Sequence, residues 1–473
     1  MSDGLVLIIF FGVMLCLTFS GSTLFTSLGF TAVVGIFLWL GVRHLQQYGM
    51  IAYTQGTNFN QVIAPMFIMM SEFLSQGRIA EDIYAVLSRA VGKFKGGLAI
   101  ATTLACTIFA ALCGSSPATA ASIGRISINE MVKRGYSPDF AVGTVAAGGT
   151  LGIMIPPSIT FCFFGILTET SIVKLLISGI LPGIMLSLLI IASIVIRVRI
   201  NPTLINNDSK SMETPKNPDE IDGAAAREIM DTVMQAAREE AGIAKNGADA
   251  SSPQLKRKEA RFTTILPAII LIFVVLGSMY AGLATPIEAA GYGVIGSLVI
   301  CILQRRLTGK MFLNVMRSTA RTGTMLIFLV MCGFTMTYVI SYLGIAQNIA
   351  QAITTSGLNR YVVLLILYVL WFILGMLMDP ASVIILTIPF LFTALVKLGF
   401  DPLWIGVVSV LASQLAMITP PVGMNLFVLK ANTDVAMGDI IKGSIPYVVI
   451  LLIGLAILTV FPQLATILPN LMF

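Results

Sequence analysis

Residues 133–158 read KRGYSPDFAVGTVAAGGTLGIMIPPS, and residues 397–422 read KLGFDPLWIGVVSVLASQLAMITPPV. The two stretches share a lysine, a glycine, an aromatic residue, a proline and a closing Pro-Pro pair, each offset by 264 positions. Further upstream, Pro117 and Pro380 are offset by 263, which implies one inserted residue. This internal repeat predicts two related halves, residues 1–200 and 262–473.

The composition is that of an integral membrane protein. The chain has 473 residues, of which 56% are apolar and 11% charged, with a mean hydropathy of +0.92. A soluble domain carries roughly a quarter charged residues. Residues 201–261 hold 11 of the 23 acidic and 9 of the 29 basic residues, so we expect a cytoplasmic polar insertion there, with a helix over 223–241. The net charge of +6 reflects membrane topology, and we expect no nucleic-acid partner.

Several classes of chemistry are excluded by residue types that are missing. The six cysteines show no CxxC spacing, and His44 is the only histidine. A Walker A motif is absent, because Lys310 is followed by methionine. An intramembrane aspartyl hydrolase needs two aspartates, whereas Asp379 stands alone in its span. We therefore expect no enzyme, no cofactor and no metal other than sodium as a coupling ion.

Ten apolar runs are long enough to cross the roughly 30 Å hydrocarbon core of a bilayer. They cover residues 4–19, 24–42, 61–75, 140–168, 173–196, 263–281, 289–303, 322–343, 402–428 and 444–462. Two further apolar stretches, 97–132 and 361–396, are interrupted by Gly114-Ser115-Ser116-Pro117 and by Asp379-Pro380. Each is either one re-entrant helical hairpin or a pair of crossings.

The lysines and arginines predict the orientation of these spans. With the N-terminus outside, most bases near the spans fall on the cytoplasmic side, as the positive-inside rule requires. The exceptions are Arg43, Lys174, Arg360 and Lys397. Five crossings plus one hairpin in each half make the repeats inverted, with both termini periplasmic and 201–261 cytoplasmic. Counting each hairpin as two crossings leaves this result unchanged, so charge alone does not separate the two readings.

The four interruptions occupy corresponding positions in the two halves: Gly114 to Pro117, Pro156-Pro157, Asp379-Pro380 and Pro420-Pro421. Proline inside a span frees backbone carbonyls, which must then be paired by protein, water or an ion. Broken helices in matching positions are typical of secondary transporters, with the site where the breaks meet. Carbonyl and hydroxyl oxygens suit sodium, and the spans contain hardly any carboxylates to relay protons. Kinking for packing is the alternative for the prolines, and helix capping is the alternative for Asp379.

Read in order, several strings resemble the large membrane subunit of tripartite ATP-independent periplasmic (TRAP) transporters, the DctM-like family. In the first half they are Gly96 to Ala99, Gly114 to Ala120, Lys133 to Tyr136, Gly148 to Ile153 and Pro156 to Ser158. In the second half they are Thr285 to Ala290, Met378 to Pro380 and Thr419 to Gly423. One departure is the stretch 413–416, which lacks the glycine usual in the family.

The resemblance implies sodium-driven uptake of an organic acid across the bacterial inner membrane. A periplasmic substrate-binding protein delivers the acid, and a smaller Q-type membrane subunit braces this one. It also implies an elevator mechanism, in which the hairpins and broken helices move as a transport domain against a scaffold. A stand-alone sodium-dependent di- or tricarboxylate carrier is the alternative. The implied sodium and substrate residues are Ser115, Ser116, Gly149, Thr150, Gly375, Asp379, Pro380 and Thr419.

Overall fold

The computed structural model describes residues 3–205, 262–345, 347–348, 351, 357–420 and 422–472. Every regular element within these residues is a helix. Most of the polar insertion, including the predicted helix over 223–241, lies outside the described residues, and so does Pro421.

The described part of the first half consists of helices joined by short turns. They are α1 (Asp3–Phe19), α2 (Leu24–Gly35), α3 (Leu45–Gly56), α4 (Ile63–Gln76), α5 (Ile79–Val91), α6 (Gly97–Cys113), α7 (Ser116–Lys133), α8 (Pro138–Met154), α9 (Ile159–Thr168), α10 (Ile172–Ser178) and α11 (Ile180–Ile200).

The second half repeats much of this order. Its described helices are α13 (Phe262–Tyr280), α14 (Pro286–Leu303), α15 (Gly309–Tyr342), α17 (Arg360–Leu377), α18 (Pro380–Lys397), α19 (Pro402–Ala416), α20 (Met424–Asn432), α21 (Met437–Val460) and α22 (Gln463–Met472). The helices break at the predicted positions, between α6 and α7, α8 and α9, α17 and α18, and α19 and α20.

Seven helical stretches of the described chain have the length and apolar composition of membrane spans. They are Pro138–Thr168, Ile172–Ile200, Pro286–Leu303, Gly309–Tyr342, Arg360–Leu377, Pro380–Lys397 and Met437–Val460. Four apolar helices are shorter: Leu24–Leu40, Gly97–Cys113, Thr264–Tyr280 and Pro402–Ala416. The described part of the chain is thus all-helical, as predicted, with several candidate membrane spans. The number of ten crossings stays a prediction, because breaks divide several of the predicted runs into shorter helices.

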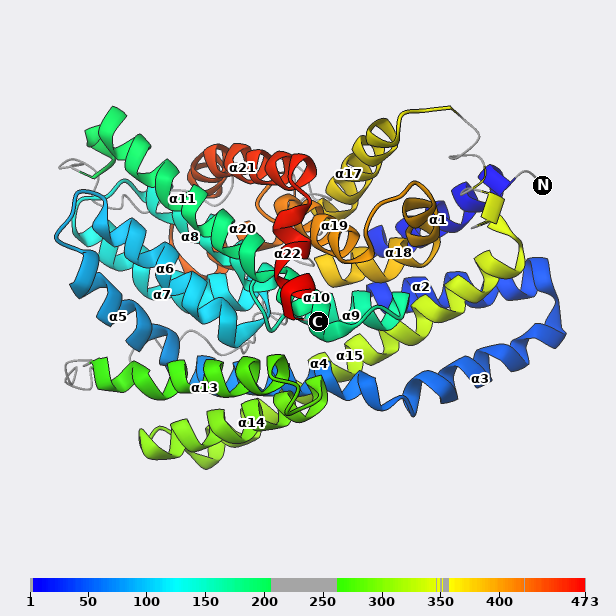
Figure 1. The fold of residues 1–473 in the computed structure, drawn as a ribbon, viewed down its shortest axis with the longest axis horizontal. Coiled ribbons are helices and arrows are strands. Elements are labelled where there is room, and N and C mark those ends of the chain that lie inside the picture. The colour runs from blue at the N-terminus through cyan, green and yellow to red at the C-terminus, as the bar shows by residue number, and fades with distance from the viewer. Residues whose placement is uncertain are drawn as a thin grey trace.

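The helices pack as two groups (Figure 1). The first group, which we call the outer group, contains α1 to α4 and α13 to α15, with α15 packed on α2, α3 and α4. The second, the inner group, contains α6 to α11 and α17 to α22. All four breaks lie in the inner group. Helix α5 lies between the two, packing on α6 and α7 from one side and on α13 from the other.

Contacts between the halves occur in matched pairs. In the inner group α9 packs on α18 and α7 packs on α20, so the second arm of each interrupted pair contacts the broken helix of the other half. In the outer group α2 packs on α15 and α4 packs on α14. Each of these four contacts thus joins one helix of the first half to one helix of the second.

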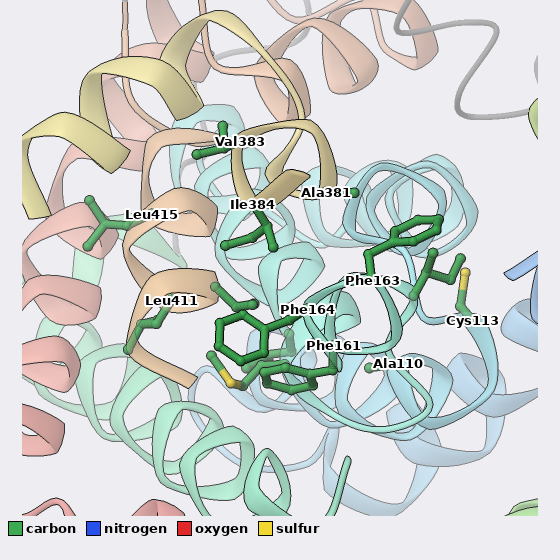
Figure 2. Packing of buried hydrophobic residues seen from close by; sticks show 14 of the residues in the cluster. Ala110, Cys113, Phe161, Phe163, Phe164, Ala381, Val383, Ile384, Leu411 and Leu415 are labelled. Carbon is green, nitrogen blue, oxygen red and sulfur yellow. The ribbon is translucent and has the colours of Figure 1, made fainter. Parts of the chain in front are cut away.

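Aromatic side chains of α9 fill the space between α18 and α19. Figure 2 shows Phe164 beside Ile384 of α18 and Leu411 of α19. The ring of Phe164 also lies edge-on to Phe392, with the ring centres 5.8 Å apart. Phe164, Ile384 and Leu411 are fully buried, and Phe392 is half-buried. The contact fixes the short helix after the first Pro-Pro break against the second interrupted pair.

The corner between α4 and α5 is held by the turn that joins α14 to α15. The Arg306 guanidinium forms an ion pair with Asp82 at 2.8 Å and donates to the Gly77 carbonyl at 2.6 Å. Both charged side chains are largely buried. Helix α5 therefore begins at a fixed point on the outer group and leads into the inner group.

Candidate functional site

The first interruption, between α6 and α7, packs directly on the first Pro-Pro break. Gly114 has a positive φ of 66°, and a Cβ there would lie 2.4 Å from the Pro157 carbonyl oxygen. A Cβ at Gly152 would lie 2.4 Å from the Ser115 carbonyl oxygen. These distances are too short for any side chain, so glycine is required at both positions. The tip of this helix pair and the broken helix behind it form one packed unit.

The predicted polar residues of the first half are buried in this unit. Ser116 and Thr150 are fully buried. The Thr150 hydroxyl donates to the Ala147 carbonyl at 2.7 Å, while Ser116 Oγ accepts a hydrogen bond of 2.7 Å from the side chain of Asn425. Gly149 lies against Ala120, whose Cβ is 2.7 Å from the position of an added Cβ. The first half thus places buried hydroxyl oxygens at and behind its tip.

The second interruption, between α17 and α18, has a carboxylate at its tip. Asp379 caps α18 by accepting from the Ser382 backbone N–H at 3.0 Å, and it also accepts from the Ser382 hydroxyl. Pro380 is the first helical residue. A Cβ at Gly375 would lie 2.6 Å from the Ser413 carbonyl oxygen, so this tip too rests on the broken helix of its own half. Asp379 therefore caps α18, and its role at an ion site stays a prediction.

The second Pro-Pro break is a loop between α19 and α20. The Thr419 hydroxyl donates to the Leu415 carbonyl at 2.9 Å. The loop closes through a backbone hydrogen bond of 3.1 Å from Asn425 N–H to the Met417 carbonyl, and Gly423 has a positive φ of 58°. Pro420 is half-buried in this loop.

A cavity of about 70 Å³ lies where the two tips meet. Its polar lining from the inner group comprises Ser115, Ser116, Asp379 and Thr160. The outer group adds Ser71, Glu72 and Thr322. Pro117, Pro380 and Met417 contribute apolar surface. Of the predicted site residues, the structure brings Ser115, Ser116, Asp379 and Pro380 together. Gly149, Thr150, Gly375 and Thr419 lie on the packed elements behind the cavity wall.

The ionisable side chains of the cavity lining are all acidic. Glu72 and Asp379 are both part of it, and it includes no lysine, arginine or histidine. Glu72 is held by hydrogen bonds from the Ser318 hydroxyl at 2.7 Å and the Gln76 amide at 2.8 Å. Helices α7 and α18 both begin at the cavity, and a helix N-terminus favours negative charge. The site therefore offers oxygen ligands to a cation and helix N-termini to an anion.

Sequence reasoning missed three groups of this region. Glu72 stands inside an apolar run, and an acidic residue in a span is itself a functional signal. Thr160 and Thr322 gave no such signal, because isolated threonines are common in membrane helices. Asn425 is fully buried and contacts Ser116 from the other half. This contact could be recognised only from the fold, since 309 positions separate the two residues.

A larger surface hollow of about 310 Å³ lies between α5 and α7, away from the breaks. Its lining includes Arg78, Arg125 and Lys133 together with Glu81 and Glu130. None of the predicted site residues is among its lining. Four of the predicted site residues line the smaller cavity instead, where the interruptions of both halves meet.

A sequence model of the tripartite ATP-independent periplasmic transporter, DctM component, matches residues 11–464. The chain belongs to this family. It is therefore a transporter permease and not an enzyme. Its family membership and its apolar helices make it a multi-pass membrane protein. DctM permeases work with a small permease and a periplasmic binding protein.

Several curated DctM proteins are similar to this chain. It is 32% identical over 414 residues to the C4-dicarboxylate TRAP transporter large permease protein DctM of Pseudomonas aeruginosa, with 87% of each chain covered. It is 27% identical over 417 residues to the sialic acid TRAP transporter large permease protein SiaM of Vibrio cholerae, covering 88% of this chain and 87% of the other. It is 28% identical over 464 residues to the ectoine TRAP transporter large permease protein TeaC of Halomonas elongata, covering 97% and 98%.

Among solved structures, the YdaH transporter of Alcanivorax borkumensis has a similar fold. The TM-score is 0.58 at 16% sequence identity, with 91% of each chain covered. At this identity the likeness concerns the fold alone. Together, the DctM relatives establish binding-protein-dependent solute uptake as the activity of the family, with solutes that differ from one relative to the next.

Proposed function

We propose that this DctM chain catalyses sodium-coupled uptake of an organic acid that a periplasmic binding protein delivers. The observation that carries the proposal is the cavity between the two interrupted helix pairs. Two carboxylates and several hydroxyls line it, and no basic side chain does. An organic anion entering such a site needs positive charge nearby, because burying an unpaired charge is costly. Bound sodium ions supply that charge and link the anion to the sodium gradient.

Sodium is favoured over protons as the driver by the kinds of ligand present. Hydroxyl, carbonyl and carboxylate oxygens around the tips suit a hard monovalent cation. A proton relay needs a chain of titratable groups across the membrane, whereas Glu72 and Asp379 are the only acidic residues of the cavity lining.

The inverted repeat and the elevator motion belong to the same proposal. The exchange of partners between α9 and α18 and between α7 and α20 supports a twofold relation between the halves. The division into an outer and an inner group supports a transport domain that moves against a scaffold. The lysines and arginines near the spans support an orientation with both termini periplasmic and residues 201–261 cytoplasmic. Labelling by a membrane-impermeant reagent in intact cells at a cysteine introduced at position 210 would contradict this orientation.

The proposed function predicts the requirements for uptake in proteoliposomes. The chain, reconstituted with its Q-type subunit and the binding protein of its own operon, should accumulate that protein's ligand only when sodium is higher outside. A pH gradient without sodium should give no accumulation, because the cavity lacks a proton relay. Uptake that needs no binding protein would favour the stand-alone carrier, and uptake that ignores sodium would refute the coupling.

A further inference from the structure

Gln414 is a buried polar residue that the transport site described so far does not use. It lies in the last turn of α19 and is fully buried. Neither its amide oxygen nor its amide nitrogen has a hydrogen-bond partner in the described part of the chain. A buried amide with both groups unpaired destabilises a fold unless a ligand or water pairs with it.

The internal repeat relates Gln414 to a predicted site residue of the first half. The offset of 264 pairs Gln414 with Thr150 and Ser413 with Gly149, while the offset of 263 pairs Asp379 with Ser116. Thr150 and Ser116 are the predicted site residues of the first half whose hydroxyl side chains are fully buried. Gln414 and Asp379 therefore occupy, in the second half, the positions that those two hydroxyls occupy in the first.

Backbone contacts place this turn of α19 next to the second tip. A Cβ on Gly375 would lie 2.6 Å from the Ser413 carbonyl oxygen and 3.0 Å from the Ala416 side chain. The Met417 N–H donates to the Gln414 carbonyl at 3.0 Å, and Met417 lines the cavity together with Asp379. In the first half, the segment from Gly149 to Gly152 lies against the first tip in the same way.

A second unpaired amide oxygen lies on the other side of the same loop. Asn425 is fully buried, and its side-chain oxygen has no partner among the described residues. Its backbone N–H bonds to the Met417 carbonyl at 3.1 Å. Buried amide oxygens without a partner among the described residues thus lie on both sides of the loop that follows α19.

We propose that Gln414 coordinates the coupling cation of the second half through its amide oxygen, as the counterpart of Thr150. This assignment rests on the proposed sodium coupling. A side-chain amide oxygen is a neutral, hard ligand of the kind that alkali and alkaline-earth cations accept in proteins. Unlike the carboxylate of Asp379 at the neighbouring tip, it brings no charge of its own.

The test compares thermal unfolding of the purified complex in sodium chloride and in choline chloride at equal ionic strength. Sodium should raise the melting temperature of the unsubstituted protein, because it binds the folded state. Gln414→Leu should melt higher than the unsubstituted protein in choline, since it removes an unpaired buried amide, and should lose most of the rise in sodium. The sodium concentration for half-maximal uptake should rise roughly tenfold, as for loss of one ligand-supporting group.

Ser409→Ala is the matched control, because this buried hydroxyl on the same helix already donates to the Gly406 carbonyl at 3.0 Å. It should leave the response to sodium unchanged. Gln414→Thr introduces the residue that the first half has at the corresponding position, Thr150, and should retain part of the rise in melting temperature with sodium. It serves as the test variant if Gln414→Leu fails to fold.

The outcomes separate the two proposals. No sodium response in the unsubstituted protein, in unfolding or in uptake, would refute the sodium coupling itself. Suppose that Gln414→Leu, or Gln414→Thr in its place, shows the full rise in melting temperature with sodium and an unchanged sodium concentration for half-maximal uptake. That result would refute the role of Gln414 alone. A lower melting temperature for Gln414→Leu in both salts, with the rise intact, would make the amide structural.

Discussion

Replacing Gly152 with leucine is expected to abolish uptake while the protein still reaches the membrane. Even the first carbon of a side chain at this position would lie 2.4 Å from the Ser115 carbonyl oxygen and 2.6 Å from the Thr119 hydroxyl. Leucine therefore displaces the tip of the α6–α7 pair from α8. A displacement of about 1 Å in a binding site commonly costs on the order of 100-fold in function.

Gly291→Leu is the matched control, since Gly291 lies in α14 and nothing is within 4 Å of an added Cβ. Both variants insert the same side chain into a helix. Initial rates of radiolabelled uptake, normalised to the amount of protein in the membrane, should differ between them by more than tenfold. Equal rates would mean that the close packing of the first tip on α8 has no part in transport.

Asp379→Asn and Ser116→Ala are each expected to raise the sodium concentration for half-maximal uptake by roughly tenfold, since loss of one ligand to a metal costs at least that much. Asparagine caps a helix about as well as aspartate does, so Asp379→Asn removes the charge and keeps α18 intact. The dependence of uptake on the concentration of the binding protein should change much less, because that protein docks at the surface.

Asp401→Asn gives the control for charge removal at a helix start. Asp401 caps α19 by accepting from the backbone N–H groups of Leu403 and Trp404 at 2.8 and 3.2 Å, and it is not part of the cavity lining. The sodium dependence of uptake by the Asp401→Asn variant should match that of the unsubstituted protein. If Asp379→Asn and Ser116→Ala also match it, the two tips are packing features and the site assignment is wrong.

Much of the fold follows from local sequence signals. Proline and glycine in apolar runs predicted where all four helix breaks lie, because backbone groups freed in a membrane must be paired locally. The capping of α14 by Thr285 and Glu288 is of the same local kind. The extra short helices α3 and α5 were not expected, since neither is apolar enough to register as a span.

The composition of the cavity was predictable only in part. Ser115, Ser116, Asp379 and Pro380 lie at the breaks themselves and were found from them. Contributions from the outer group and from the opposite half depend on which helices pack together. Local patterns carry no information about these long-range pairings. The contact of Asn425 with Ser116 and the buried, unpaired amide of Gln414 therefore appeared only in the structure, whereas Glu72 could have been noticed as an acidic residue inside an apolar run.

The accessibility of the cavity during transport tests most directly whether the transported acid and sodium bind between the two tips. Ala381 lines the cavity and is nearly isosteric with cysteine. A small thiol reagent modifies Ala381→Cys at a rate that is corrected for the rate in the unsubstituted chain. This corrected rate should fall at least fivefold when sodium and the transported acid are both present. The reason is that the ligands occupy the cavity and the tips close around them. An unchanged rate, in a variant whose uptake still depends on sodium, would place the transport site elsewhere.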